Sequence, residues 1–319
     1  MKDRPSGPSS TTATPDAFTM AQMATLDVPH LGGIKAAYYM PKPYDKSKST
    51  LILIHGFSMS SHVFQDHFTS QSLTDQMNLI GIDVIGHGGT EIKNETFTYW
   101  DTAIMNIQVM DALGIKQAFV LGTSHGGAIS VRMYLVAPER IEGVIPIGAL
   151  MDCESQRAHD LGCWNALTGF ESLIDTWTSS LPTPQFELDD AYCNFVVDVD
   201  FGATCPEEIR DFWKKTIKEA YRGDEGRKKI RMAAINLRDR DGLHGRLEYV
   251  RCPVLWMHGT DDVVNSVANA EQEIALFRNS PDARLLVVNE GLHALSYSHL
   301  EAVEQAVMEF VKKHQKKEL

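Results

Sequence analysis

The chain has 319 residues, of which 43% are hydrophobic and 23% are charged, a composition typical of one large globular domain or two modest ones. Its 30 basic and 42 acidic residues give a formal net charge of −12. This charge repels phosphate backbones, so no nucleic-acid partner is expected, and it provides no attraction to anionic membranes. No apolar run approaches the ~20 residues of a membrane span.

Residues 1–17 are rich in Ser, Thr, Pro and charge and contain no apolar signal region. They predict a flexible tail that is not a secretory signal. The five cysteines have no metal-site spacing, which favours reduced thiols and a cytoplasmic protein. Four of them lie between Cys153 and Cys205, so a disulfide in that region remains the less favoured alternative.

From residue 18 the chain alternates short apolar runs with segments of helical period. A hairpin is predicted around Gly32 and Gly33, and Thr98 with Asp101 forms a capping-box pattern that opens a helix through Leu113. The remaining predicted strands are 49–56, one within 77–88, 117–122, 142–150, 252–259 and 283–290. The further predicted helices are 62–73, 128–137, one after 252–259 and one from about His299.

Continuous apolar strands that alternate with helices indicate a mostly parallel sheet covered by helices on both faces. This rhythm stops between residues 151 and 248, a segment that holds three of the five tryptophans. We therefore predict an α/β core of residues 18–150 and 249–319. A helical cap, residues 151–248, is inserted after the sixth strand.

The stretch GTSHGG, residues 122–127, directly follows an apolar run. Gly-x-Ser-x-Gly at the end of a strand permits a very tight turn into a helix, which presents the serine hydroxyl as a nucleophile. Ser124 is the predicted nucleophile. Such a serine needs a base, an acid that orients the base, and amides that bind an oxyanion.

The loops after the later strands provide these groups, at the edge of the sheet where ligands bind in open α/β folds. His293 is the candidate base, whereas His299 is expected to help cap the last helix. Asp261 and Asp262 are both candidate acids. The amides of His125 and Phe57 are the expected oxyanion donors, and His55 and His258 are expected to bond turn backbone.

In this order and spacing, the motifs HGF, DVIGHGGTE, GTSHGG, HGTDD and GLH resemble the α/β-hydrolase superfamily. The resemblance covers residues 18–315 and is nearest to the lid-bearing esterases, lipases and cofactor-free haloperoxidases. The third position after Gly259 matches the acid of that family, which favours Asp262. Serine at position 124 argues against epoxide hydrolase and dehalogenase chemistry, which the family performs with an aspartate there.

We hypothesise serine ester or lactone hydrolysis through an acyl-enzyme, without a metal or organic cofactor. The protein is expected to be a monomer or homodimer. Its substrate would be small to medium and apolar or aromatic, in a pocket lined by Ser58, Met151, Trp164 and Trp177.

Two other functions stay open. The first is hydrolysis of a carbon–carbon bond by the same triad, for which Arg132 or Arg157 could supply a cation. The second is a ligand receptor on the same fold. The acidic residues Asp189, Asp190, Asp198 and Asp200 lack the spacing of a calcium loop and are expected on a solvated face.

Overall fold

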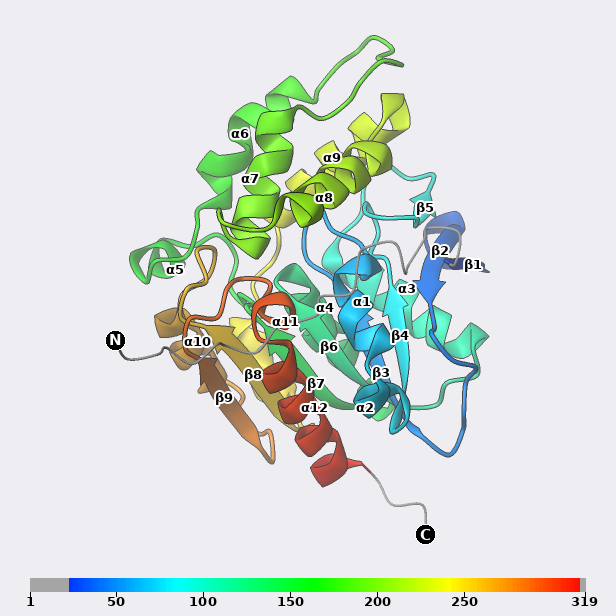
Figure 1. Ribbon diagram of the computed structural model, residues 1–319, viewed down its shortest axis with the longest axis vertical. Coiled ribbons are helices and arrows are strands. Elements are labelled where there is room, and N and C mark those ends of the chain that lie inside the picture. The colour runs from blue at the N-terminus through cyan, green and yellow to red at the C-terminus, as the bar shows by residue number, and fades with distance from the viewer. Residues whose placement is uncertain (1–22, 316–319) are drawn as a thin grey trace, which may run out of the picture.

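The computed structural model describes residues 23–315, so the tail predicted for residues 1–17 lies outside the described residues. The sheet has the strand order β1-β2-β4-β3-β6-β7-β8-β9, with β5 paired to β2 (Figure 1). The strands are Ala24–Val28 (β1), Ile34–Tyr39 (β2), Ser49–Ile54 (β3), Met77–Ile82 (β4), Glu91–Ile92 (β5), Ala118–Thr123 (β6), Ile141–Ile147 (β7), Val254–Gly259 (β8) and Ala283–Val288 (β9).

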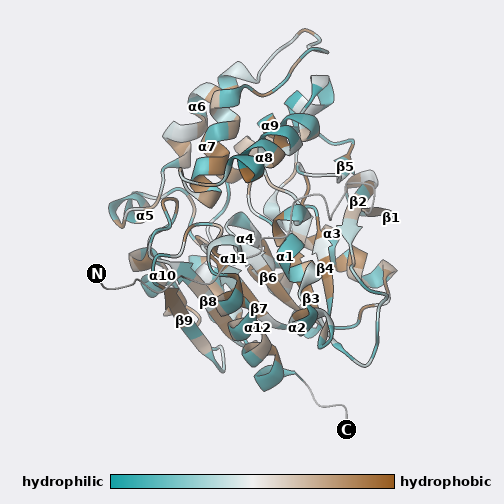
Figure 2. Cartoon of the chain, viewed as in Figure 1, coloured by the Kyte–Doolittle hydropathy of each residue, from teal (hydrophilic) through white to brown (hydrophobic). Residues whose placement is uncertain are grey.

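Six neighbouring strands, from β4 to β9 in the sheet order, run parallel. The antiparallel hairpin of β1 and β2 extends the sheet beside β4. Apolar side chains pack on both faces of the sheet, with Ile129 of α4 on one face and Phe310 of α12 on the other. Figure 2 shows hydrophobic residues along the central strands and hydrophilic ones on outer helices such as α12. The predicted fold class is confirmed.

The helices around this sheet follow the predicted order, and Thr98 and Asp101 form the predicted capping box of α3. The helices are Gln65–Thr69 (α1), Gln71–Thr74 (α2), Tyr99–Ala112 (α3), His125–Val136 (α4), Gln156–Asp160 (α5), Ala166–Thr176 (α6), Asp190–Phe201 (α7), Glu207–Ala220 (α8), Gly223–Arg238 (α9), Val267–Ile274 (α10), Leu295–Ser298 (α11) and Leu300–His314 (α12).

The structure differs from the sequence prediction at four places. The helix predicted over 62–73 is broken at Ser70, which is extended (ψ 114°) and donates its hydroxyl to Glu304 at 2.8 Å. The edge strand β9 leaves Leu286 and Val287 exposed. The unpredicted β5 places the helical segment after the seventh strand in chain order. His299 is the N-cap residue of α12, but its side chain makes no capping hydrogen bond.

Helices α5 to α9 lie between β7 and β8 in the chain, and Figure 1 shows α6 to α9 together at one end of the sheet. We call residues 151–248 the helical insertion. Trp177 and Trp213 are buried in one apolar cluster that also contains Met59 and Ala294, from the loops after β3 and β9. The insertion therefore packs directly on two loops of the sheet.

Two further findings bear on the sequence predictions. The cysteines are all free. Among residues 23–315, none of the helices has both the length and the apolar character that crossing a membrane requires.

Candidate active site

Ser124 occupies the turn between β6 and α4 in a strained backbone conformation. Its φ of 56° and ψ of −123° lie in a region that L-residues rarely adopt. A Cβ atom at Gly122 would collide with the backbone of Gly126, and one at Gly126 would collide with the carbonyl of Ile54. The two glycines therefore let strand and helix approach closely enough to hold the serine in this turn.

His293 follows β9, and its Nδ1 atom lies 2.9 Å from each carboxylate oxygen of Asp262. Asp262 also accepts the backbone N–H groups of Val264 and Asn265, at 2.8 and 2.9 Å. Its side chain is only 1% exposed. Asp261 is exposed and bonds Thr260. The structure therefore brings Asp262, of the two candidate acids, to the histidine.

The environment of this pair shifts both pKa values. Burial disfavours the charged imidazole, but the Asp262 carboxylate and its hydrogen bond outweigh burial and raise the pKa of His293 to about 8. Burial alone would raise the pKa of Asp262, yet His293 holds it below its usual range. Each group thus favours the charged form of the other.

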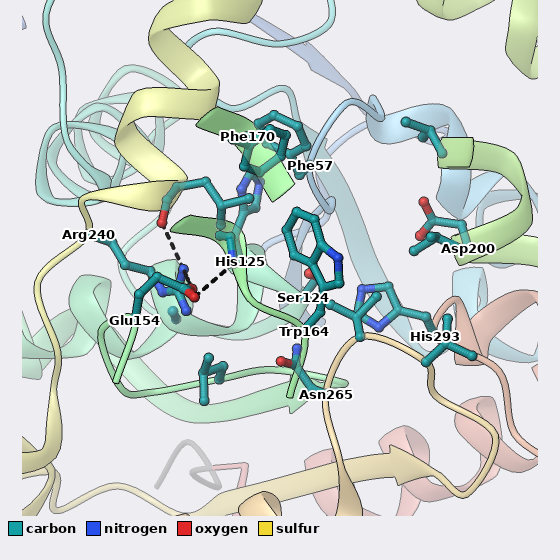
Figure 3. Close-up of a pocket in the computed structure, with 18 of the residues that line it drawn as sticks. Phe57, Ser124, His125, Glu154, Trp164, Phe170, Asp200, Arg240, Asn265 and His293 are labelled. Atoms are coloured by element: carbon teal, nitrogen blue, oxygen red, sulfur yellow. Dashed lines mark hydrogen bonds and ion pairs between the residues drawn. The ribbon is translucent and has the colours of Figure 1, made fainter. Parts of the chain in front are cut away.

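Ser124 and His293 line one cavity of about 290 Å³. Figure 3 shows the imidazole of His293 directed toward this cavity, near Ser124. A carboxylate can only accept a hydrogen bond, so Nδ1 of His293 carries the proton that Asp262 accepts. This tautomer leaves the lone pair of the neutral ring on Nε2, which can take a hydroxyl proton.

The two predicted oxyanion donors belong to the residue after the nucleophile and to the loop after β3. His125 is the first residue of α4, so its N–H belongs to the helix terminus, where N–H groups lack intrahelical acceptors. A Cβ atom at Gly56 would lie 3.4 Å from the Cβ of Ser124. The loop after β3, including Phe57, therefore passes close to the nucleophile, and Phe57 and His125 both line the cavity.

His55 and His258 bond turn backbone, as predicted. Nδ1 of His55 lies 2.7 Å from the Gly56 carbonyl, and the N–H of Val84 donates to its Nε2 at 3.1 Å. Nε2 of His258 lies 2.7 Å from the Asn265 carbonyl. The first histidine joins the loops after β3 and β4, and the second braces the loop that carries Asp262.

The walls of the cavity are mostly apolar and aromatic, with contributions from Phe57, Phe170, Phe195 and Val196. Trp164 lines the cavity, as predicted. The other three predicted lining residues do not. Ser58 bonds the hydroxyl of Tyr192 at 2.6 Å, Trp177 packs against the Tyr192 ring in the core of the insertion, and Met151 is buried with the sheet core.

Three charged lining residues were missed from the sequence: Glu154, Asp200 and Arg240 (Figure 3). Arg240 bonds Glu154 at 2.6 Å, and both side chains are almost fully buried. Asp200 was expected on a solvated face but is 7% exposed. Arg132 and Arg157, considered from the sequence, pair instead with Asp241 and with Asp152 and Glu273, outside the cavity.

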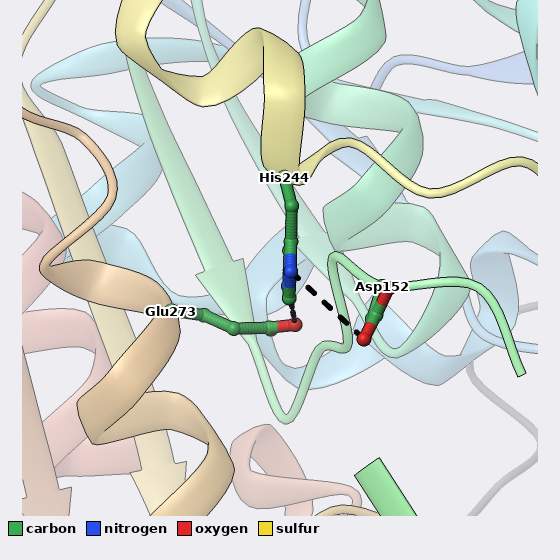
Figure 4. Close-up of side chains that lie close together, drawn as sticks. All are labelled: Asp152, His244 and Glu273. Atoms are coloured by element: carbon green, nitrogen blue, oxygen red, sulfur yellow. Dashed lines mark hydrogen bonds and ion pairs between the residues drawn. The ribbon is translucent and has the colours of Figure 1, made fainter. Parts of the chain in front are cut away.

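Asp152, His244 and Glu273 have ligand atoms within 4.8 Å of one another and could in principle hold a metal ion (Figure 4). Their atoms are already engaged, since His244 bonds Glu273 at 2.7 Å. The guanidinium of Arg157 lies 3.3 Å from both carboxylates. A cation already sits on these carboxylates, so the cluster is an ion-pair network that ties α5 to α10.

A family model of the alpha/beta hydrolase fold matches residues 49–300. The chain therefore belongs to the α/β-hydrolase fold family. This membership supports the prediction that the protein is a hydrolase.

Several relatives are similar over most of the chain. The uncharacterized hydrolase YugF of Bacillus subtilis is 24% identical over 271 residues, 83% of this chain and 90% of the relative. The pimeloyl-[acyl-carrier protein] methyl ester esterase of Nitrosomonas europaea is 25% identical over 256 residues, 76% of this chain and 88% of the relative. A thermophilic esterase from Thermogutta terrifontis superimposes with a TM-score of 0.74 at 17% identity, covering 92% of this chain and 100% of that chain. At this identity the structural likeness shows the fold alone.

Proposed function

We propose that this chain is a serine hydrolase that cleaves carboxylic esters or lactones through Ser124, His293 and Asp262. The observation that carries the proposal is the His293 imidazole. Asp262 holds it at 2.9 Å in one tautomer, in a cavity that Ser124 also lines. The similarity to proteins named as esterases agrees with this chemistry.

In the proposed reaction, Nε2 of His293 takes the Ser124 proton as the hydroxyl oxygen attacks the carbonyl carbon. Asp262 stabilises the imidazolium that forms. The amides of Phe57 and His125 bind the oxyanion, and one such donor is typically worth ~10²–10³ in rate. His293 then protonates the departing alcohol. In the second half of the reaction, His293 takes a proton from water, which attacks the acyl-enzyme, and the acid is released as the proton returns to Ser124.

The cavity suggests the class of substrate. Its volume of about 290 Å³ is at the lower end of small-molecule sites. Aromatic walls from Phe57, Trp164 and Phe170 favour an apolar or aromatic acyl group. We therefore propose small to medium esters as substrates.

Turnover of short p-nitrophenyl esters and of a lactone panel tests the proposal. Wild-type protein should hydrolyse them, and Ser124→Ala should lower kcat on the order of 10⁶-fold. A matched control is Ser130→Ala, in the same helix but outside the cavity.

Two results would overturn the proposal. Activity that survives in Ser124→Ala removes the nucleophile. Folded wild-type protein that hydrolyses no ester favours the ligand receptor, or carbon–carbon hydrolysis if a diketone panel is cleaved instead.

A further inference from the structure

Asp200 is a buried residue whose carboxyl group has no hydrogen-bond or ion-pair partner among the residues that the structure describes. Glu154 and Asp200 are the two carboxyl side chains among the described residues that line the cavity, and Glu154 is paired with Arg240. Across residues 23–315, no hydrogen bond or ion pair reaches the Asp200 carboxyl group, and the residue as a whole is only 7% exposed. A buried carboxyl without a partner destabilises a fold.

The position of Asp200 in its helix adds to this destabilisation of the fold. It is the penultimate residue of α7, Asp190–Phe201, and a negative charge at a helix C-terminus opposes the helix dipole. Three and four residues earlier, Val197 and Val196 are buried on the same face, which turns Asp200 inward. Asp198 lies on the other face, where it pairs with Arg210 at 2.7 Å.

Asp200 lies on the His293 side of the cavity. Its backbone carbonyl accepts the N–H of Ala294, the residue after His293, at 3.1 Å. Figure 3 shows Asp200 and His293 on one side of the cavity, and Glu154 and Arg240 on the opposite side. Burial raises the pKa of Asp200 to about 7, with His293 opposing the rise. Near neutral pH the group is present as carboxylate and as acid, and both forms accept hydrogen bonds.

We propose that Asp200 is a specificity residue that binds a hydrogen-bond donor, a hydroxyl or a protonated amine, on the alcohol portion of the substrate. This inference rests on the proposed function, in which His293 protonates the leaving alcohol, so that portion of the ester lies beside His293 and within reach of Asp200. The acyl group then occupies the aromatic part of the cavity.

Two pairs of butyrate esters of nearly equal shape test the proposal. The 2-hydroxyethyl ester is compared with the propyl ester, and the 2-(dimethylamino)ethyl ester, protonated at neutral pH, with the 3-methylbutyl ester. In wild-type protein kcat/KM should favour the donor-bearing ester, about tenfold for the hydroxyl and about 10- to 100-fold for the amine. Both preferences should disappear in Asp200→Leu, and the amine preference should fall in Asp200→Asn.

Asp198→Asn, two residues away and half exposed, is the matched control and should keep both preferences. A larger preference in the hydroxyl pair would indicate that Asp200 binds a neutral donor, and a larger preference in the amine pair that it binds a cation. Equal kcat/KM within both pairs in wild-type protein would overturn the proposal. An equal loss of kcat/KM for all four esters in Asp200→Leu would also overturn it, because Asp200 would then act only by positioning His293.

Binding separates this proposal from the proposed function. Calorimetric titration of the same four esters into Ser124→Ala, and into Ser124→Ala combined with Asp200→Leu, measures the preference without turnover. If wild-type protein hydrolyses no ester but the Ser124→Ala protein shows a binding preference that depends on Asp200, the proposed reaction is wrong and Asp200 remains a donor-binding residue. If wild-type protein hydrolyses the esters but neither binding nor kcat/KM distinguishes the members of each pair, the proposed reaction stands and the role of Asp200 is wrong.

Discussion

The Nδ1–H group of His293 donates to the Asp262 carboxylate, 2.9 Å from each of its oxygens. Asp262 is itself held by the backbone N–H groups of Val264 and Asn265, so the imidazole is oriented by a carboxylate that cannot turn freely. The arrangement fixes which ring nitrogen faces the cavity. Asp262, which follows β8, thereby sets the tautomer of His293, which follows β9.

Asp262→Asn should lower kcat for p-nitrophenyl butyrate by about 10⁴-fold, because an amide can stabilise the wrong tautomer and cannot stabilise the imidazolium. Asp261→Asn changes the neighbouring, exposed residue in the same way and should leave kcat within about twofold of wild type. A larger loss in Asp261→Asn than in Asp262→Asn would reverse the assignment of the acid. Circular dichroism of both variants checks that they are folded.

The pH dependence of kcat/KM should report the titration of His293 in the free enzyme. The proposed base must be neutral, and its pKa is raised to about 8. Activity should therefore rise with pH, level off above about pH 8, and be about 100-fold lower at pH 6 than on the plateau. The residual activity of Asp262→Asn should level off at lower pH, because the main cause that raises the pKa of His293 is gone, while burial and the smaller effect of Asp200 remain. A wild-type profile that is flat from pH 6 to 9 would contradict the assignment.

Much of the fold and of the candidate site is visible in the sequence because its signals are local. The apolar strands and the glycines around Ser124 determine backbone geometry within a few residues. Ser124, Asp262 and His293 each follow a predicted strand. Because parallel strands end at the same edge of the sheet, these residues could be expected to lie close together. Residue type alone did not separate Asp261 from Asp262, and only the family resemblance favoured Asp262. The difference between them lies in which side chain reaches His293.

The charged residues of the cavity were missed because they come from the helical insertion, which carries no motif. Asp200 was grouped with Asp189, Asp190 and Asp198 as a solvated acidic stretch. One signal was present: Asp200 continues the buried stripe of Cys193, Val196 and Val197 at helical spacing. Glu154 and Arg240 are 86 residues apart in the numbering, and only the packing of the insertion brings them together.

Ser124→Gly should be more stable than Ser124→Ala by about 1 kcal/mol, because glycine relieves the strain at φ 56°. At Ser172, an exposed residue within α6, the same comparison should have the opposite sign, since glycine in a helix costs about 1 kcal/mol relative to alanine. Urea denaturation of the four variants measures both differences. Equal stability of Ser124→Gly and Ser124→Ala would mean that the turn is not strained.

The buried pair of Glu154 and Arg240 should be strongly coupled. Arg240→Met leaves the Glu154 carboxylate buried without its cation and should cost about 3–5 kcal/mol in the free energy of unfolding. Adding Glu154→Gln should recover a large part of that loss in a double-mutant cycle. The exposed pair of Lys42 and Asp75, 2.7 Å apart, is the matched control and should show no measurable coupling. If the double variant lost as much stability as the sum of the losses in Arg240→Met and Glu154→Gln, the prediction of coupling would be wrong.

Covalent labelling by a fluorophosphonate, with the modified residue located by mass spectrometry, tests the proposed proton relay most directly. The adduct should lie on the Ser124 hydroxyl of wild-type protein and should form at least about 10³-fold more slowly in folded His293→Gln. An adduct on another residue, or labelling of Ser124 at an unchanged rate in His293→Gln, would show that His293 does not activate this serine.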